Sequence, residues 1–361
     1  MSYAKQIRSV KDYIKLPFVF NHWYVAGLSS EFTEEPVART LLNRSLVFYR
    51  TKAGEVVAMQ NRCLHRSFPL SEGYLEGDDL VCRYHGIRYA PDGQIRRIPC
   101  QDQTSKKKLR TYKLKEVGAF VFIWMGEAEE ADESTFPEVD FLADPGFRTL
   151  LGTVPLEGNY LLLMENLNDL THFAYLHKDT FSFDDDFFDL PTQVEKTDKG
   201  VWCNRIDRNR ESALRALPPQ YHELAGDKPV ERWDGGMCVS PGVFQGYAPT
   251  YIGAEDDPER KVFKQHIMHY TTPETEKTSH YWWSVSLDFE LENDMYHEMM
   301  TAHLGKGFDE DKWAVQKMQQ LLDNDQIDFN EMVIAGDQAG LLYRKVMLKW
   351  VQAEYGEASA A

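Results

Sequence analysis

Two cysteine–histidine pairs are the side chains of this 361-residue sequence that are best suited to chemistry. Cys63 and His65 are separated by one residue, Cys82 and His85 by two, and sixteen residues lie between the pairs. Each spacing places a thiolate beside an imidazole on one turn, so two such loops at hairpin tips can enclose a binuclear iron cluster. Each loop then gives its sulfur to one iron and its nitrogen to the other. Because two imidazoles replace two thiolates, such a cluster has a raised reduction potential, which suits an electron relay.

Two alternatives compete with an iron–sulfur cluster. A structural zinc ion also takes two cysteines and two histidines, but its ligand pairs usually have roughly two to five residues between them, so the Cys-x-His pair is unusual for zinc. The four residues could also meet by chance in a hydrophobic core. The spacing favours a [2Fe-2S] cluster over both alternatives.

A second group of candidate ligands lies in the segment 165–177. His172 and His177 are five residues apart, and Asp169 lies three residues before His172. On a regular helix Asp169 and His172 share one face, whereas five residues turn by about 140°, so the two histidines do not. Both histidines can bind one metal only if the helix is distorted or ends between them. The alternative is a polar helix face with two hydrogen-bonded histidines.

A carboxylate would complete the facial triad of two histidines and one acid that leaves iron positions open for dioxygen and substrate. The C-terminal part of the chain offers the candidates Asp309, Glu310, Asp311, Asp323, Asp325 and Asp328. At helical spacing Asp311 shares a mostly apolar face with Ala314, Val315, Met318 and Leu322. Asp309 instead lies on a polar face and Glu310 on a mixed one. A carboxylate on an apolar face is costly unless it is paired or binds a metal, so Asp311 is the predicted ligand.

The composition restricts the class of protein. A formal net charge of −17 argues against nucleic acid as a partner, because its phosphates would be repelled. No apolar run approaches the ~20 residues of a membrane span, and residues 1–8 lack the apolar core of a secretion signal. We therefore expect a soluble, cytoplasmic protein without a disulfide framework. Cys100, Cys203 and Cys238 are expected to be reduced and to have no part in the cluster.

The first third of the chain has the pattern of a small all-β domain. Strands are predicted for four runs rich in β-branched and aromatic residues, at 45–50, 55–59, 86–89 and 119–124. The Pro-Asp-Gly sequence at 91–93 predicts a tight turn. The acidic stretch 126–134 contains few apolar residues and predicts a linker.

The rest of the chain has a mixed pattern. Helices are predicted at 158–177, 308–322 and 331–354, and a long hairpin at 261–289 with its turn at 272–274. This mixture predicts an α+β domain after the β domain. The expected organisation is a domain of residues 1–130 followed by a domain of residues 131–361.

Several segments resemble one family. Residues 61–89, with Tyr-His-Gly after the second cysteine, resemble the Rieske domain of ring-hydroxylating and demethylating oxygenases, and 21–26 resembles the start of that family. Residues 166–177 resemble its Asn-x-x-Asp-x-x-His-x4-His motif, and 310–312 its carboxylate-ligand segment. The most similar branch is that of vanillate O-demethylase and dicamba demethylase, with further likeness at 336–344.

The resemblance implies a fold and two cofactors. The fold is an N-terminal all-β Rieske [2Fe-2S] domain followed by a catalytic domain with a helix-grip fold, in which an antiparallel sheet surrounds a long helix. The implied cluster ligands are Cys63, His65, Cys82 and His85, and the implied ligands of a mononuclear Fe(II) are His172, His177 and Asp311. Asp169 would hydrogen-bond a metal-binding histidine and bridge toward the Rieske histidine of a neighbouring subunit in a homotrimer, with Asn166 assisting.

The resemblance also implies a reaction. A terminal oxygenase component would use O2 and electrons from NAD(P)H, delivered by a separate reductase with or without a ferredoxin, to demethylate or hydroxylate an aromatic substrate. One alternative is ring hydroxylation or dihydroxylation of an aromatic, polycyclic or alicyclic compound. Another is a Rieske electron-transfer protein without oxygenase activity. Residues 178–260 match the family least and are expected to shape the pocket, with 181–189 as a pocket wall or an acidic surface loop.

The region around the two cysteine–histidine pairs has its own charge balance. Residues 62–110 contain ten basic and six acidic side chains, although the whole chain has a net charge of −17. We interpret this excess as a docking face for an acidic electron donor. The alternative is a chance distribution of surface charges.

Overall fold

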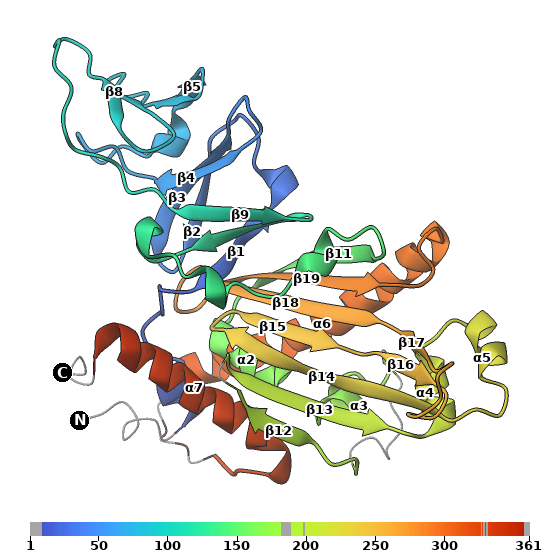
Figure 1. Cartoon of the computed structure of the whole chain (residues 1–361). Helices are drawn as coiled ribbons and strands as arrows, with labels where there is room; N and C mark the ends of the chain where they lie inside the picture. The colour runs from blue at the N-terminus through green and yellow to red at the C-terminus, as the bar shows by residue number, and fades with distance from the viewer. Residues whose placement is uncertain are drawn as a thin grey trace. The chain divides into compact units, whose positions relative to one another are not determined.

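The fold is given by a computed structural model, which describes residues 9–181, 189–197, 199–325, 327, 329 and 331–356 (Figure 1). The chain divides into two compact units. The smaller unit is formed by Phe20–Phe136 and Thr272–Thr275, and the larger by Met1–Val19, Pro137–Thr271 and Glu276–Ala361. Residues 9–19 therefore belong to the larger unit by their contacts, which the sequence did not indicate. That residues 1–130 and 131–361 are separate domains stays a prediction.

The smaller unit contains three antiparallel sheets. The first has the order β1–β10–β9, with bounds Trp23–Leu28, Phe120–Trp124 and Lys113–Val117. The second has the order β2–β3–β4, with bounds Val37–Leu41, Arg44–Arg50 and Val56–Gln60. The third has the order β5–β6–β7–β8, with bounds Tyr74–Glu76, Asp79–Val81, Arg88–Tyr89 and Ile95–Arg97. The all-β character predicted for this part of the chain is confirmed.

Each of the four runs predicted as strands coincides with a strand, although the run 86–89 forms strand only at Arg88 and Tyr89. The predicted turn at 91–93 joins β7 to β8. Gly93 there has a φ of 86°, a left-handed conformation that glycine adopts without steric cost. Its N–H donates to the carbonyl of Ala90 at 2.8 Å.

A hydrophobic core in this unit anchors the loops that carry the cysteines. Val47, Met59, Leu80 and other buried residues pack in one cluster that also contains Cys63 and Cys82. The two cysteine loops are therefore attached to a buried, close-packed core, which limits their movement.

The larger unit is built on a sheet of nine antiparallel strands. Its main path has the order β11–β19–β18–β15–β14–β13–β12, and β16 pairs with β14 and β17. The bounds are Arg148–Leu156, Ser279–Leu287, Gln265–Pro273, Val243–Tyr247, Val230–Ser240, Val201–Asp207 and Gln193–Lys196 along this path, then Thr250–Ile252 for β16 and Lys261–Phe263 for β17. β18 and β19 are neighbours in the sheet, so the predicted hairpin is confirmed. Its predicted turn at 272–274 was wrong by a few residues, because β18 continues through Pro273, and residues 261–263 form the separate strand β17.

Helices accompany this sheet, which confirms a mixed sheet and helix domain. They are α1 (Val10–Tyr13), α2 (Tyr160–Leu167), α3 (Phe173–Leu176), α4 (Arg210–Arg215), α5 (Pro219–Ala225), α6 (Asp294–Asn324) and α7 (Gln338–Tyr355). Figure 1 shows α2, α3 and α6 behind the sheet. α6 packs against β11 and α2, so the longest helix lies beside the helix that leads to the two candidate histidines.

The helices differ in extent from the sequence prediction. Instead of one helix over 158–177, α2 ends at Leu167 and only a single turn, α3, forms later. The helix predicted at 308–322 begins fourteen residues earlier, where Asn293 caps α6 by accepting from the N–H of Tyr296. The helix predicted at 331–354 begins only at Gln338.

The buried stripe of α6 also differs in part from the expected one. Leu304, Phe308, Asp311, Val315 and Gln319 are buried, at a spacing of three or four residues. Met318, which was expected on this face, is 41% exposed. After Asp311 the buried residues recur at every fourth position, so Gln319 rather than Met318 is buried. The predicted burial of Asp311 is confirmed.

No helix among the described residues combines the length and the hydrophobicity that crossing a bilayer requires.

Two glycines of α6 provide a matched test of this packing. A Cβ at Gly305 would meet only a Trp283 atom at 4.0 Å, whereas a Cβ at Gly307 would overlap the ring of Phe181. We expect Gly305→Ala to stabilise the fold by up to about 1 kcal/mol, because alanine favours the helix. Gly307→Ala should instead destabilise it by about 1–3 kcal/mol. Thermal unfolding of both variants would show this, and equal melting temperatures would contradict the packing of Phe181.

Candidate functional site

The two cysteine loops of the smaller unit have the same backbone design. The carbonyl of Cys63 accepts from the N–H of Ser67 at 3.0 Å, and that of Cys82 from the N–H of Gly86 at 2.8 Å. Ser67 and Gly86 both have a left-handed φ, 57° and 72°. Non-glycine residues rarely adopt this conformation, so its presence at Ser67 shows how strongly the loop geometry is imposed.

The cysteines and the histidines of the two loops differ in solvent exposure. Cys63 and Cys82 are buried, whereas His65 and His85 are exposed and their ring centroids lie 4.6 Å apart. The hydroxyl of Tyr89 lies 3.2 Å from Sγ of Cys63 and accepts from the N–H of Leu64 at 3.1 Å. The predicted four residues are therefore brought together, with the sulfurs inside and the imidazoles outside.

This donor set fits a binuclear cluster. Burial raises the pKa of the Cys82 thiol, so a thiolate there requires a metal to stabilise it. The two sulfurs lie inside and the two imidazoles lie outside, which fits a cluster in which one iron takes both sulfurs and the other takes both imidazoles.

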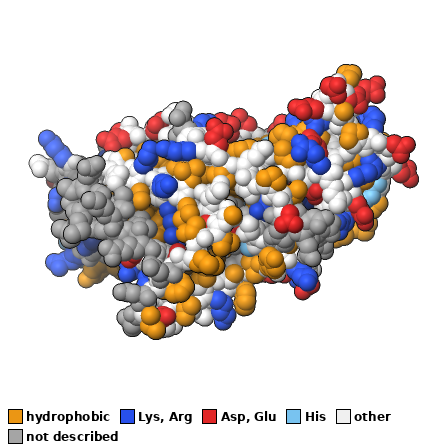
Figure 2. Space-filling view, turned by 90° about the horizontal axis from the view of Figure 1, so that it is seen from below, with side chains coloured by type: hydrophobic (Ala, Val, Ile, Leu, Met, Phe, Trp, Pro, Cys, Tyr) orange, Lys and Arg blue, Asp and Glu red, His pale blue; other side chains and the backbone are white. Residues whose placement is uncertain are grey.

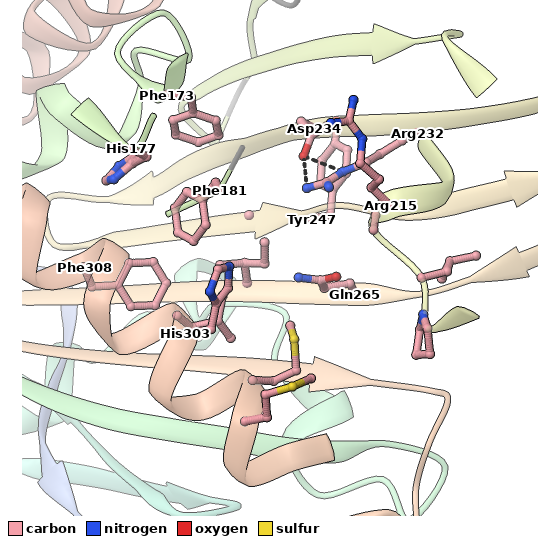
Figure 3. A pocket seen from close by; sticks show the side chains of 18 of the residues that line it. Phe173, His177, Phe181, Arg215, Arg232, Asp234, Tyr247, Gln265, His303 and Phe308 are labelled. Carbon is pink, nitrogen blue, oxygen red and sulfur yellow. Dashed lines mark hydrogen bonds and ion pairs between the residues drawn. The ribbon is translucent and has the colours of Figure 1, made fainter. Parts of the chain in front are cut away.

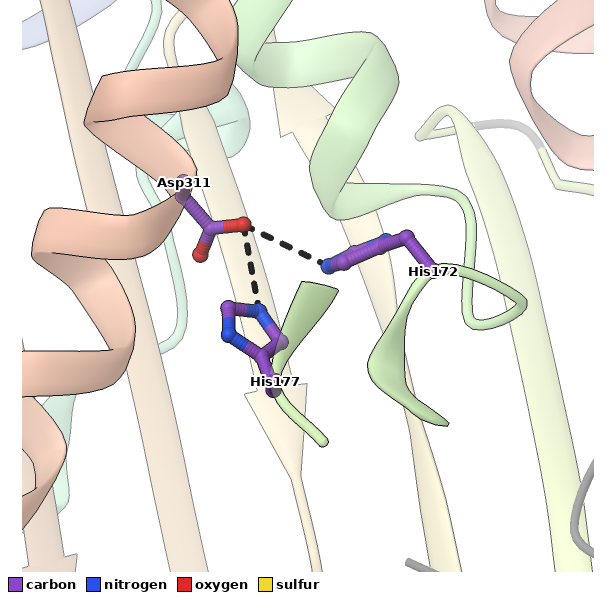
Figure 4. Close-up of side chains that lie close together, drawn as sticks. All are labelled: His172, His177 and Asp311. Atoms are coloured by element: carbon purple, nitrogen blue, oxygen red, sulfur yellow. Dashed lines mark ion pairs between the residues drawn. The ribbon is translucent and has the colours of Figure 1, made fainter. Parts of the chain in front are cut away.

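A second group of ligands lies in the larger unit. His172, His177 and Asp311 place one ligand atom each within 4.8 Å of the others (Figure 4). Oδ1 of Asp311 lies 3.4 Å from Nε2 of His172 and 3.2 Å from Nε2 of His177. The chain leaves the helical conformation after α2, so His172 precedes α3 and His177 follows it. This break before the first histidine allows both rings to point to one position.

The polar atoms of these three side chains are satisfied better by a metal ion than by hydrogen bonds to one another. Nε2 of His172 and Oδ1 of Asp311 are buried and have no hydrogen-bond partner among the described residues, although they lie close together. Buried polar atoms normally have such partners. Two imidazole nitrogens and one carboxylate that converge in this way can hold a non-haem Fe(II) and leave coordination positions open.

The electrostatics of this group agree with metal binding. Burial tends to raise the pKa of the Asp311 carboxyl, but the contacts with His172 and His177 outweigh it and keep this pKa below its usual range. Burial tends to lower the pKa of His177, and here the contacts with Asp311 and Glu310 outweigh it and raise the pKa. The carboxylate is therefore ionised at neutral pH and available to a cation.

Glu310 has a role that the sequence did not reveal. Its Oε2 lies 2.8 Å from Nδ1 of His177, and its Oε1 accepts from Oγ1 of Thr180 at 2.5 Å. A carboxylate on Nδ1 selects the tautomer of His177 whose Nε2 is unprotonated and can bind metal. In the sequence, the hint was that Glu310 is the neighbour of Asp311. Only the fold shows that the carboxylate of Glu310 contacts Nδ1 of His177, whereas Asp311 contacts Nε2.

The hydrogen bonds described for Asp169 are local ones. Its Oδ1 accepts from the N–H of Thr171 at 2.7 Å and from the Thr171 hydroxyl, which stabilises the turn before His172. Nδ1 of His172 is buried without a hydrogen-bond partner in the described part of the chain, as is Oδ1 of Asn166. The roles of Asp169 and Asn166 in coupling the two centres stay predictions.

The other candidate carboxylates lie away from this group. Asp309 is exposed, Asp323 pairs with Lys277 at 3.0 Å, and Asp325 accepts from the N–H of Ile327. Asp328 lies outside the described residues, as do residues 182–188 of the segment expected to form a pocket wall or a surface loop.

A cavity of about 550 Å³ adjoins the three ligands. Phe173, Phe181 and Phe308 line it near His177, whereas Arg215, Arg232, Asp234, Tyr247 and Gln265 gather at its other end (Figure 3). Residues between 178 and 260 contribute to this lining, as expected. The sequence did not indicate the part played by α6, which adds Met295, Met299, Met300 and His303.

Comparison with known proteins places both units in described families. Residues 22–113 match the Rieske [2Fe-2S] domain, and residues 156–353 match the vanillate O-demethylase oxygenase C-terminal domain. The iron–sulfur subunit of the toluene-4-sulfonate monooxygenase system of Comamonas testosteroni is 32% identical over 349 residues, covering 94% of this chain and 99% of that protein. The vanillate O-demethylase oxygenase subunit of a Pseudomonas strain is 28% identical, covering 95% of this chain and 98% of that protein.

Solved structures agree with the sequence comparison. Dicamba monooxygenase bound to 3,6-dichlorosalicylic acid superimposes with a TM-score of 0.82 at 26% identity, covering 94% of this chain and 99% of that one. The same enzyme with non-haem iron and dicamba gives a TM-score of 0.77 at 25% identity, covering 94% and 98%.

Replacement of the ligands provides a direct test of the two centres. We expect Asp311→Ala, purified anaerobically, to lose the mononuclear iron and product formation but to keep the Rieske absorption and electron paramagnetic resonance signals. Cys63→Ser should lose those signals. Asp309→Ala, which changes an exposed acid two residues away, serves as the control and should behave as wild type. Full iron content in Asp311→Ala would mean that another carboxylate is the ligand.

Glu310 can be tested separately because it touches a ligand and not the metal. We expect Glu310→Ala to lower the affinity for mononuclear Fe(II) by about 10–100-fold, since Nδ1 of His177 loses its partner. Glu310→Gln, which keeps an oxygen acceptor, should lie between this variant and wild type. Competition with a chelator would measure the affinity. An unchanged affinity in Glu310→Ala would contradict the orienting role.

Proposed function

This chain belongs to the vanillate O-demethylase family of Rieske oxygenases, and we propose that it is the terminal oxygenase component that monooxygenates an aromatic substrate. The observation that carries the proposal is the convergence of His172, His177 and Asp311 on one wall of a cavity lined by aromatic side chains. The protein is an oxidoreductase that carries a Rieske [2Fe-2S] cluster and a mononuclear non-haem iron. Its electrons come from a separate reductase, as in the multicomponent systems of its relatives.

We assign each cofactor to the residues that fit it. Cys63 and Cys82 would hold one iron of the cluster, and His65 and His85 the other. His172, His177 and Asp311 would hold the mononuclear iron. When bound, the cluster supplies electrons and the mononuclear iron activates dioxygen.

The protein's own contribution is to position the substrate and to exclude water. Phe173, Phe181 and Phe308 provide an apolar surface beside the ligands, against which an aromatic ring can pack. Phe181 lies 4.8 Å from the ring of His177 and 5.7 Å from that of His303, centroid to centroid, so it limits solvent access to the ligands. These side chains place a substrate carbon near the metal without taking part in bond changes.

We propose that the attacked carbon is a methyl group. One oxygen atom of O2 enters a C–H bond and the other leaves as water, with two electrons and two protons consumed. A methyl carbon on oxygen or nitrogen then gives a hemiacetal or hemiaminal, whose bond between the heteroatom and carbon breaks to release formaldehyde. The names of the vanillate and dicamba O-demethylase relatives support demethylation. The name of the toluene-4-sulfonate relative supports monooxygenation, and the compound in that name carries a methyl group on its ring.

Two further parts of the proposal concern partners. Arg62, Arg66 and Arg83 are exposed beside the histidines of the cluster loops, which supports docking of an acidic donor, either the reductase itself or a ferredoxin.

Tyr175, which lies between His172 and His177 in sequence, is 78% exposed, and Trp313 on α6 is 59% exposed. Figure 2 also shows hydrophobic side chains between the charges on one face. Exposed apolar side chains of this kind support an interface with another protein chain. We propose that the partner is a second copy of this chain, within a homotrimer in the cytoplasm.

The reaction is tested with a substrate panel. Methoxylated and N-methylated aromatics, ring-methylated aromatics and non-methylated analogues would be turned over with reductase under 18O2, and formaldehyde, oxygen uptake and product mass would be measured. We expect one labelled oxygen per product or per formaldehyde. A cis-diol carrying two labelled oxygens would show ring dihydroxylation instead, and the absence of any oxygenated product would favour electron transfer alone.

A further inference from the structure

The opening of the cavity is bordered by those lining residues that are also exposed to solvent. In the described part of the chain these are Arg215 in α4, Pro219 and Gln220 in α5, and Met295, Met299 and His303 on α6. The opening therefore lies between the two short helices and the N-terminal half of α6. A small molecule that enters or leaves the cavity passes these side chains.

The sulfur atoms of the cavity lining are gathered on the α6 side of this opening. Among the described lining residues, sulfur occurs only in Met295, Met299 and Met300, which we call the rim methionines. Met295 is 80% exposed, Met299 is 59% exposed and Met300 is half-buried. Methionine is usually a buried residue, so hydrophobic packing does not explain two mostly exposed ones at an opening.

α6 leads from the metal ligands to the rim methionines. Asp311 and Phe308 are buried on this helix, whereas His303 is exposed, and Figure 3 shows Phe308 and His303 along it. At a rise of 1.5 Å per residue, Met300 lies about 17 Å and Met295 about 24 Å from Asp311 along the helix axis. A small molecule formed at the metal ligands therefore meets thioethers within a short distance, before it reaches the solution.

We propose that the rim methionines are a modification site, at which hydrogen peroxide formed in the cavity converts their thioethers into sulfoxides. The inference rests on the proposed function, which supplies the peroxide: two electrons and two protons that reduce O2 without oxygenation of a substrate give H2O2. The sulfur then takes one oxygen atom as the O–O bond breaks, and the other oxygen atom leaves as water. The sulfur loses two electrons and the peroxide gains them, so no further reactant is needed.

Oxidation would change the opening in a defined way. A thioether is apolar and flexible, whereas a sulfoxide is polar, so the α6 side of the opening would become polar. An aromatic substrate would then enter past polar rather than apolar side chains. The change is reversible, because methionine sulfoxide reductases restore the thioether. Reduction of O2 without oxygenation would thus leave a reversible mark on the protein in which it occurs.

Two methionines outside the cavity provide controls within the same chain. Met332 is 83% exposed, close to the value for Met295, and Met318 lies on α6 and is 41% exposed. Neither is among the described residues that line the cavity. Peroxide in the solution should oxidise methionines according to exposure, and therefore Met295 and Met332 alike. Peroxide formed in the cavity should instead oxidise the rim methionines first.

The test uses the full-length protein with both metal centres loaded. It would be reduced with dithionite under argon, freed of excess dithionite and exposed to O2 over several cycles, with each compound of the substrate panel and without any. Catalase in the solution would remove peroxide that leaves the protein, and peptide mass spectrometry would measure sulfoxide at each methionine. We expect at least about tenfold more sulfoxide at the rim methionines than at Met332, because peroxide meets them before it is diluted.

Two variants assign the oxidation to the cavity. Asp311→Ala, which is expected to lose the mononuclear iron, should keep its rim methionines reduced in these cycles but form sulfoxide when H2O2 is added without catalase. The triple variant Met295→Leu, Met299→Leu, Met300→Leu nearly conserves side-chain volume, so the fold should persist. Without catalase it should release into the solution the peroxide that the wild type consumes in forming sulfoxide.

Equal sulfoxide at Met295 and Met332 in the presence of catalase would overturn the inference, as would rim oxidation in Asp311→Ala under the same cycles. Selective rim oxidation without any oxygenated product would support the modification site and contradict the proposed monooxygenation. Oxygenated products, together with O2 consumption that exceeds them but no rim sulfoxide, would support the proposed function and contradict the modification site. No O2 consumption under any condition would contradict both.

Discussion

A buried, ionised carboxylate is the constraint on which the larger unit depends. Asp311 is 3% exposed, and a charge in that position is tolerated only if cationic or metal partners face it. α6 must therefore present Asp311 to His172 and His177, and α2 must end before His172 so that both imidazoles reach the same point. The contact between Glu310 and His177 follows from the same helix register, because Glu310 is the neighbour of Asp311 in sequence.

In the smaller unit, loops rather than helices position the candidate metal ligands. Two short segments repeat one hydrogen-bonding pattern, with a left-handed residue four positions after each cysteine. Because the hydrophobic core includes Cys63 and Cys82, the sulfurs are buried while His65 and His85 remain at the surface. An electron donor can thus approach the histidines, while the protein shields the more negatively charged sulfur ligands from solvent.

The cavity connects the metal chemistry with selection of the substrate. Its aromatic wall comes from the segment around α3 and from α6, and its charged end from α4 and β14. Strands and helices that are far apart in sequence therefore bring aromatic side chains beside the metal ligands and charged side chains to the opposite end of the cavity.

The sequence by itself determined the parts of this protein that depend on short-range spacing. The cysteine–histidine pairs, the two histidines after Asp169, the strands of the first third and the long hairpin could all be predicted, since each is a local pattern. Asp311 could be chosen because a helical face spans only a few residues, although Met318 proved exposed. The tertiary structure alone decided that α2 ends early, that Glu310 contacts His177, and that Arg215 and Arg232 meet at one end of a cavity. These features could not be predicted, because each depends on contacts between elements that are far apart in sequence, and no spacing within a single segment records such long-range contacts.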